Sequence, residues 1–316
     1  MLLIDTHMTR SVLKPSSKAP RCLLCGGCSH HQLSGRVQGG EHRQTLICKT
    51  CGLIFMVQPE GMEFRNETFH GSKPPTQSRV LKSLRRGAAI AEWIESSRGE
   101  LDSVTWLDQD SRVLDVGSGT GGELEVFRQL FGCEVRGVEP DTTFARFASE
   151  QMGIPTDSVP FQEVELEECF DLVIMSHSLF CFSRPDEVLG RIRRLLTEEG
   201  LLYVSVGNYL RPKRWEGLAN YLLKDYKLFC FTKVSLERLL ALTGFTPIQI
   251  DDKSSPGDLQ VLARRSSHPV SDLESVGENW VKLVLFFFVY DVLSFVRRVA
   301  RRISGFTSSI LSRQRS

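Results

Sequence analysis

The sequence lacks a hydrophobic run that could cross a membrane. Its longest unbroken apolar stretch covers residues 283–290, whereas a spanning helix needs about 20 such residues. It also lacks a strong charge of either sign. The formal net charge is +1, so no overall field attracts nucleic acid and we expect no nucleic-acid partner. With no repeats or low-complexity tracts either, the chain has the composition of an ordinary globular protein.

The first ten residues lack the basic-then-apolar pattern of a secretory signal. The nine cysteines are an odd number, which would leave one unpaired in an oxidising compartment. Both observations predict a reducing environment, which we take to be the cytoplasm. A peripheral position at the inner face of a membrane is the alternative, because the C-terminal segment is both apolar and basic.

Cysteines gather near the N-terminus. Four of them form two C-x-x-C pairs separated by 22 residues: Cys22 with Cys25, and Cys48 with Cys51. Four thiolates in this pattern can surround one tetrahedral zinc ion. Such a site has no open coordination position, so we predict a structural zinc and not a catalytic one. Reduced, unliganded thiols and a redox pair are the alternatives.

From residue 112 onward, expected strands and helices alternate. We predict strands at 112–116, 134–139, 170–175 and 201–206, helices at 123–131, 142–151, 186–196 and 233–243, and a closing pair of strands at 245–250 and 259–263. A further helix is predicted at 79–98, where apolar residues recur at helical spacing. This alternation predicts an α/β fold, a doubly wound and mostly parallel sheet with helices on both faces.

A glycine-rich loop follows the first of these strands and opens a helix. Gly117, Gly119 and Gly122 satisfy the G-x-G-x-x-G pattern of dinucleotide-binding proteins, so a nicotinamide-dependent oxidoreductase is one hypothesis. Asp115 argues against it, because a carboxylate there would repel a pyrophosphate but suits a cationic ligand. Glu139, at the end of the next strand, can accept hydrogen bonds from the ribose hydroxyls of either cofactor. A glycine-rich turn without a ligand is the third reading.

Several stretches in this region resemble the class I S-adenosylmethionine-dependent methyltransferases. They are VLDVGSGTG at 113–121, GVEPD at 137–141, FDLVIMSH at 170–177, LLTEEGLLYV at 195–204 and FTKVSLERLL at 231–240. The resemblance covers residues 80–265 and implies a Rossmann-like, seven-stranded sheet with its last strand antiparallel. It also implies that S-adenosylmethionine is the cofactor. The methionine part would lie on the glycine loop, the ribose on Glu139 and the adenine on the segment before Phe170. The loop residues concerned are Gly117, Ser118, Gly119 and Gly121, with Asp115 before them.

The acceptor of such an enzyme should lie outside the carboxyl ends of the strands. Ser176 and His177 end the fourth strand there; we assign Ser176 to the cofactor site. His177 is our candidate general base, because an imidazole titrates near neutral pH. A histidine that only hydrogen-bonds a loop is the alternative. Many relatives have His-x-Leu-Glu-His at this point, whereas this chain has HSLFC at 177–181. The missing groups imply altered chemistry, an acceptor positioned by other residues, or a non-catalytic cofactor-binding protein.

The CGLIF sequence at 51–55, ahead of such a domain, resembles a bacterial subgroup with an N-terminal zinc ribbon. Some members of that subgroup act on sugar nucleotides or other polar metabolites. The resemblance therefore implies a small polar acceptor, such as a sugar nucleotide or a cell-envelope glycan precursor.

These patterns divide the chain into six parts. They are a flexible arm at 1–20, a zinc-ribbon-like unit at 21–57, a linker at 58–78, a methyltransferase domain at 79–265, a linker at 266–279 and an amphipathic, basic helical tail at 280–316. For residues 280–303 of the tail we weigh two roles. One is an interfacial helix on a membrane surface. The other is a helix packed on the domain or on a second subunit.

Overall fold

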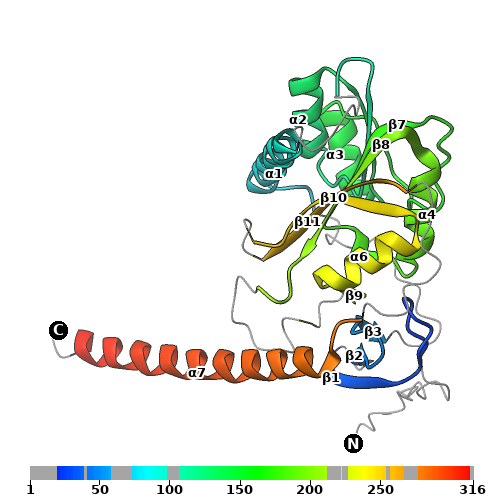
Figure 1. The fold of residues 1–316 in the computed structure, drawn as a ribbon. Coiled ribbons are helices and arrows are strands. Elements are labelled where there is room, and N and C mark those ends of the chain that lie inside the picture. The colour runs from blue at the N-terminus through cyan, green and yellow to red at the C-terminus, as the bar shows by residue number, and fades with distance from the viewer. Residues whose placement is uncertain are drawn as a thin grey trace, which may run out of the picture.

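The computed structural model describes residues 20–38, 41–57, 73–97, 107–211, 222, 227–253, 257–266 and 277–313. Nearly all of the arm predicted at 1–20, most of the linker predicted at 58–78 and residues 267–276 lie outside the described residues. Figure 1 shows a large α/β body, a smaller sheet beside it and a long C-terminal helix.

The α/β body is built on a seven-stranded sheet, as predicted. In sheet order the strands are β10 (Phe245–Asp251), β11 (Asp258–Arg265), β8 (Leu196–Gly207), β7 (Phe170–Ser176), β4 (Arg112–Val116), β5 (Glu134–Val138) and β6 (Thr156–Asp157). Strand β11 is antiparallel to both of its neighbours, and the pairs from β8 to β6 are parallel. This confirms the mostly parallel sheet with an antiparallel last strand. The two-residue strand β6 is too short to produce a periodic signal and was not predicted.

Helices cover both faces of this sheet. Helices α1 (Gln77–Ser96) and α2 (Gly122–Phe131) lie on one face, and α4 (Pro185–Leu195) and α6 (Lys233–Leu242) on the other. Helix α3 (Thr142–Gln151) follows β5. Because side chains alternate along a strand, Leu172 of β7 joins the core under α1 and α2, while Val173 joins the core under α4 and α6.

A second sheet of four strands lies near the N-terminus. It contains β1 (His30–Gln38), β2 (Glu41–Cys48), β3 (Ile54–Val57) and β9 (Phe229–Cys230), in that order. The first three strands belong to the cysteine-rich unit, but β9 comes from far along the chain and pairs antiparallel with β3. The cysteine-rich unit therefore shares its sheet with a segment of the predicted methyltransferase domain.

The tail forms one helix, α7 (Trp280–Arg313). Its first turns pack on the small sheet, where Leu283 and Phe287 share a core with Ile47 and Ile54. Figure 1 shows the rest of α7 extending away from the body. Among the residues that the structure describes, no helix combines the length and apolar content needed to cross a membrane.

Helices α1 and α2 approach each other closely because two glycines leave room. A Cβ atom on Gly87 of α1 would lie 2.8 Å from the Cα atom of Glu123, and one on Gly122 would lie 2.9 Å from the Cβ atom of Ser83. The approach brings Arg86 to within 2.9 Å of the Glu123 carboxylate. Helix α1 is thereby held beside the glycine loop that precedes α2.

The close approach predicts that Gly87→Ala lowers the free energy of unfolding by about 1 to 3 kcal/mol, because the added methyl group overpacks against backbone atoms. The better helix propensity of alanine, worth up to about 1 kcal/mol, offsets only part of this cost. Gly190 of α4 is the matched control, since a Cβ atom there meets nothing within 4 Å. Gly190→Ala should leave the stability unchanged or raise it. Denaturant unfolding measures both variants, and equal effects would contradict the proposed packing.

Candidate functional site

A cavity of about 610 Å³ opens where β4, β5 and β7 end. Six of the residues predicted from sequence line it: Gly117, Ser118, Gly119, Glu139, Ser176 and His177. Asp115 and Gly121 do not. Several lining residues were missed by the sequence reasoning, among them Arg79, Lys82, Arg86, Glu123, Phe161, Lys227 and Asp258. The cavity thus combines the predicted loop with groups contributed by α1 and by distant loops.

The glycine loop depends on backbone conformations that favour glycine. Gly117, Gly119 and Gly121 have φ angles of 87°, 55° and 74°. A Cβ atom on Gly117 would lie 2.8 Å from the Cβ atom of Ser178, whereas one on Gly119 would meet nothing within 4 Å. The backbone at Gly119 is therefore open to the cavity, where a ligand can approach it closely.

Glu139 is fixed at the end of β5 by two backbone donors. The N–H of Gly119 donates to Oε2 and the N–H of Asp141 donates to Oε1, each at 2.9 Å. Glu139 is only 6% exposed. Burial raises the pKa of this carboxyl to about 7, although the two hydrogen bonds act in the opposite direction. The carboxylate is thus held rigidly at the cavity wall and ionises near neutral pH.

Asp115 lies behind the cavity wall. Asp115 is 1% exposed, and its Oδ1 atom has no hydrogen-bond partner among the described residues. Burial and the nearby Glu123 carboxylate raise its pKa well above the usual value, and Arg86 opposes them. Burial also raises the pKa of Glu123, which Arg86 likewise opposes. Three acidic side chains therefore surround the glycine loop in a poorly solvated environment. The sequence signal for Glu123 was an acidic residue in the first turn of the helix after the loop.

Buried hydroxyl groups add to this polar surface. The side-chain oxygens of Ser118, Thr120 and Ser178 are buried without a hydrogen-bond partner among the described residues, and all three residues line the cavity. Buried hydroxyls in folded proteins usually have a partner. Their clustering here is the arrangement expected where a polar ligand completes the hydrogen bonding.

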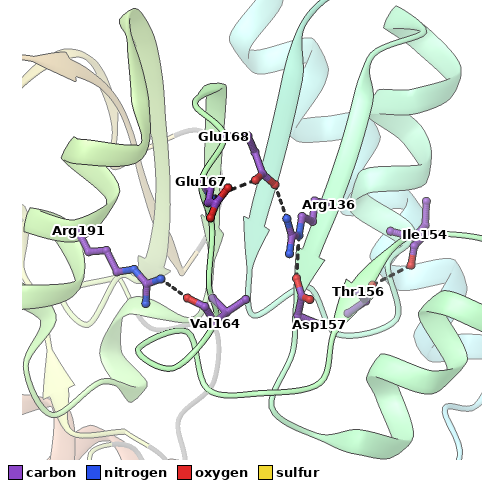
Figure 2. Close-up of polar contacts among 8 residues, drawn as sticks. All are labelled: Arg136, Ile154, Thr156, Asp157, Val164, Glu167, Glu168 and Arg191. Atoms are coloured by element: carbon purple, nitrogen blue, oxygen red, sulfur yellow. Dashed lines mark hydrogen bonds and ion pairs between the residues drawn. The ribbon is translucent and has the colours of Figure 1, made fainter.

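The segment between β6 and β7 forms the side of the cavity around Phe161. Arg191 of α4 donates hydrogen bonds to the carbonyl oxygens of Phe161 and Val164, and its guanidinium carbon lies 4.8 Å from the centre of the Phe161 ring. Arg136 of β5 pairs with Asp157 at 2.8 Å and with Glu168 (Figure 2). Figure 2 shows these two arginines anchoring the segment from opposite sides. The Phe161 ring is therefore fixed in the cavity wall, where it is 2% exposed.

His177 follows β7 in a left-handed conformation, with a φ angle of 57°. Such a conformation costs a non-glycine residue energy and is found most often at functional sites. Its N–H donates to the carbonyl of Ser205 at 2.9 Å. Its Nε2 atom lies 3.6 Å from Oδ1 of Asp258, which is in ion-pair range but longer than a direct hydrogen bond. The two residues lie 81 positions apart in the sequence, so no local motif could have linked them.

The positions that depart from the relatives' His-x-Leu-Glu-His motif also reach the cavity. Phe180 and Cys181 belong to the short helix η3 (Leu179–Cys181), and both line it. Burial raises the pKa of the Cys181 thiol to about 12, so this thiol stays protonated near neutral pH. The substitution therefore replaces two ionisable groups with an aromatic ring and a neutral thiol.

The four predicted cysteines converge on one point. The Sγ atoms of Cys22, Cys25, Cys48 and Cys51 all lie within 4.8 Å of one another. The Cys22–Cys51 and Cys25–Cys48 pairs are 3.4 and 3.5 Å apart. A zinc ion with Zn–S bonds of about 2.3 Å holds its sulfurs at nearly this separation. A hydrogen bond from Cys51 lowers the pKa of the Cys22 thiol, which favours a thiolate there.

Comparison with solved structures finds many similar chains. One is the CcbJ methyltransferase from Streptomyces caelestis, at 17% identity and a TM-score of 0.44, with 51% of this chain and 91% of that one covered. Another is an S-adenosylmethionine-dependent methyltransferase from Mesorhizobium loti, at 19% identity and a TM-score of 0.44, with 55% and 98% covered. The magnesium protoporphyrin IX methyltransferase of Synechocystis PCC 6803 has 13% identity and a TM-score of 0.46, with 66% and 100% covered. No curated protein matches the sequence.

A family model described as a methyltransferase domain matches residues 88–250, just over half of the 316 residues. The matched region runs from within α1 to β10 and contains the glycine loop, Glu139 and His177. The chain therefore belongs to the methyltransferase-domain family and is a class I methyltransferase.

Proposed function

We propose that the cavity binds S-adenosylmethionine and that the protein transfers its methyl group to a small polar acceptor. The observation that carries this proposal is the cluster of buried acidic side chains around the open glycine loop. Asp115, Glu123 and Glu139 all have raised pKa values because they are poorly solvated. A ligand with a positive sulfonium and a positive ammonium group would stabilise their ionised forms.

The described residues fit this cofactor part by part. Glu139 would accept hydrogen bonds from the ribose hydroxyls, and the backbone at Gly117 and Gly119, with the hydroxyl of Ser118, would hold the methionine part. Phe161, anchored by Arg191, lines the cavity as an apolar residue that would border the adenine. The same acidic groups would repel a pyrophosphate placed on the glycine loop, where a nicotinamide dinucleotide would bind it, which disfavours the nicotinamide-dependent alternative.

When bound, the cofactor supplies an electrophilic methyl group on a positively charged sulfur. An acceptor that carries a proton on its reacting atom needs a base to remove it, and we assign this role to His177. Its Nε2 atom faces the Asp258 carboxylate, which favours a proton on Nε2 and leaves Nδ1 as the proton acceptor. Asp258 would then be a positioning residue that stabilises the imidazolium. The presence of this pair favours catalysis over the non-catalytic alternative.

The charges at the cavity favour an acceptor with an anionic group. Arg79 and Lys82 of α1 line it on one side and Lys227 lines it near Phe180. A sugar nucleotide or a phosphorylated glycan precursor has both the hydroxyl groups and the negative charge that such a surface would recognise. We therefore propose this class of acceptor.

The proposed function is tested by incubating the full chain with methyl-labelled S-adenosylmethionine and a polar-metabolite extract of host cells. We expect label in small anionic molecules, separated by anion-exchange chromatography. Label confined to protein, or none above a boiled-enzyme control, would contradict a small polar acceptor.

We predict that affinity for S-adenosylmethionine falls as the pH falls through about 7, because protonated Glu139 accepts ribose hydrogen bonds less well. Since a single site with this pKa goes from mostly ionised at about pH 8 to mostly protonated at about pH 6, the loss should be about tenfold. Glu139→Gln should weaken binding at the higher pH and flatten the profile. The matched control is Glu134→Gln, an exposed acid of the same strand. Calorimetric titration measures the affinity of each variant at each pH. A pH dependence in Glu139→Gln equal to that of the wild type would overturn the ribose assignment.

For His177 we predict that His177→Asn lowers the methyl-transfer rate by about 10²- to 10⁴-fold, a typical contribution of a general base. Asparagine tolerates the left-handed backbone, so folding and cofactor affinity should be preserved, but its amide cannot act as the base. Asp258→Asn should give a smaller loss and move the pH–rate profile, which a merely structural residue would not do. Equal rates in wild type and His177→Asn would exclude the base assignment.

We also propose that the four-cysteine cluster is a structural zinc site. It supports neighbouring elements, since the N–H of Glu278, just before α7, donates to the carbonyl of Cys51 at 3.2 Å.

The purified chain should contain one zinc ion by elemental analysis. Cys51→Ser should lose the metal and unfold at lower denaturant concentration, because metal binding contributes directly to folding. The control is Cys28→Ser, since Cys28 lies outside the cluster. If removing the metal from the wild-type protein left its stability unchanged, the structural role of the zinc site would be contradicted.

A further inference from the structure

Helix α7 has two faces that carry apolar residues, and within the part of the chain that the structure describes, only one of them is covered by the body of the protein. On the covered face lie Leu283, Phe287, Tyr290 and Ser294, each at most 3% exposed. The exposed apolar residues are Val281, Leu285, Phe288, Val289, Val292, Leu293, Phe295, Val296 and Val299, which we call the outer stripe. Phe288 and Phe295 are 65% and 61% exposed, which is unusual for aromatic side chains without a partner surface.

The outer stripe is continuous and wide. At about 100° per residue, its members span an arc of roughly 160°, centred opposite the covered side chains. A coiled-coil seam uses only two positions in seven and forms a narrower stripe. The width of the outer stripe is that of a helix lying on an extended apolar phase, not of one paired with a second helix.

The charge of this segment also points to an anionic surface. Residues 280–316 contain seven basic side chains and one acidic one, although the whole chain has a net charge of only +1. Arg297 and Arg298 come where the covered face ends, and helical spacing puts them on the side opposite the outer stripe. Two copies of so basic a helix would repel each other, whereas anionic lipid headgroups would attract it.

The dimensions agree with a helix that lies along a surface. At about 1.5 Å per residue, the 34 residues of α7 extend for about 50 Å. Leu283 and Phe287, in its first turns, pack on the small sheet, and the far end of the helix extends beyond the body (Figure 1). Among the described residues, the outer stripe stays exposed along this length.

We infer that α7 docks in the plane of an anionic membrane surface, with the outer stripe at the acyl-chain boundary and its arginines at the lipid phosphates. The inference rests on α7 alone and does not depend on the proposed acceptor. It combines the two roles considered from the sequence: the inner face packs on the protein, and the opposite face would contact lipid.

Vesicle flotation of the full chain tests this inference. With vesicles of phosphatidylcholine and phosphatidylglycerol, the wild-type chain should float with the lipid, and raising the salt concentration should weaken this binding. With phosphatidylcholine alone, binding should be at least about tenfold weaker. The double variant Phe288→Glu/Phe295→Glu should lose binding to the anionic vesicles by about tenfold or more, because it places charges in the apolar phase.

Leu130→Glu is the matched control, because Leu130 is a similarly exposed apolar residue on α2, at 61%. It should float as the wild type does, and thermal unfolding followed by circular dichroism should show that both variants fold. Failure of the wild type to float would overturn the inference, as would flotation of the double variant at the wild-type level. A dimer in light scattering that the double variant abolishes, without vesicle binding, would assign the outer stripe to a second copy instead.

Discussion

The buried carboxylate of Glu139 is the feature on which the site depends. Two backbone N–H groups hold it, one from the glycine loop after β4 and one from the turn after β5, so it ties the ends of two parallel strands together. Close packing around it depends on Gly137, where a Cβ atom would lie 2.5 Å from the hydroxyl oxygen of Ser118. The geometry leaves a poorly solvated acid at the cavity wall, an arrangement that hydroxyl donors and positive charge on a ligand would stabilise.

The rest of the structure completes this cavity from other directions. Helix α1 adds basic side chains because glycines allow it to pack tightly against α2. Beside Phe180, the N–H of Leu228 donates to the carbonyl of Phe180, and the N–H of Met56 donates to the carbonyl of Leu228, at 2.9 and 2.8 Å. Backbone hydrogen bonds therefore run from the small sheet to the cavity wall. The cysteine-rich unit is part of the support of the site and not a separate appendage.

The sequence was sufficient for features that arise from local pattern. The alternation of strands and helices predicted the sheet, and the spacing of the glycines and of Glu139 predicted the wall of the cavity that they form. The cysteine pairs predicted which four sulfurs come together. Each of these depends on residues that are close in the chain or that follow neighbouring strands.

Other features depend on contacts between distant segments. Asp258 reaches His177 only because β11 inserts beside β8, and β9 joins the small sheet through two residues whose pairing leaves no periodic pattern. The sequence placed Asp115 in contact with the ligand, whereas the structure puts it behind the cavity wall and places Glu123 at the cavity instead. Likewise, the apolar pattern of the tail could not tell which face the body would cover.

The central claim is that the cavity is built for an adenosyl ligand with a positive charge. Calorimetric titration of the full chain with S-adenosylmethionine and, separately, with NAD tests it most directly. We predict one molecule of S-adenosylmethionine bound per chain, with a dissociation constant on the order of 1 μM to 1 mM, in the range of ordinary enzyme substrates, and no binding of NAD under the same conditions. Binding of NAD at least as tight as that of S-adenosylmethionine would contradict the account.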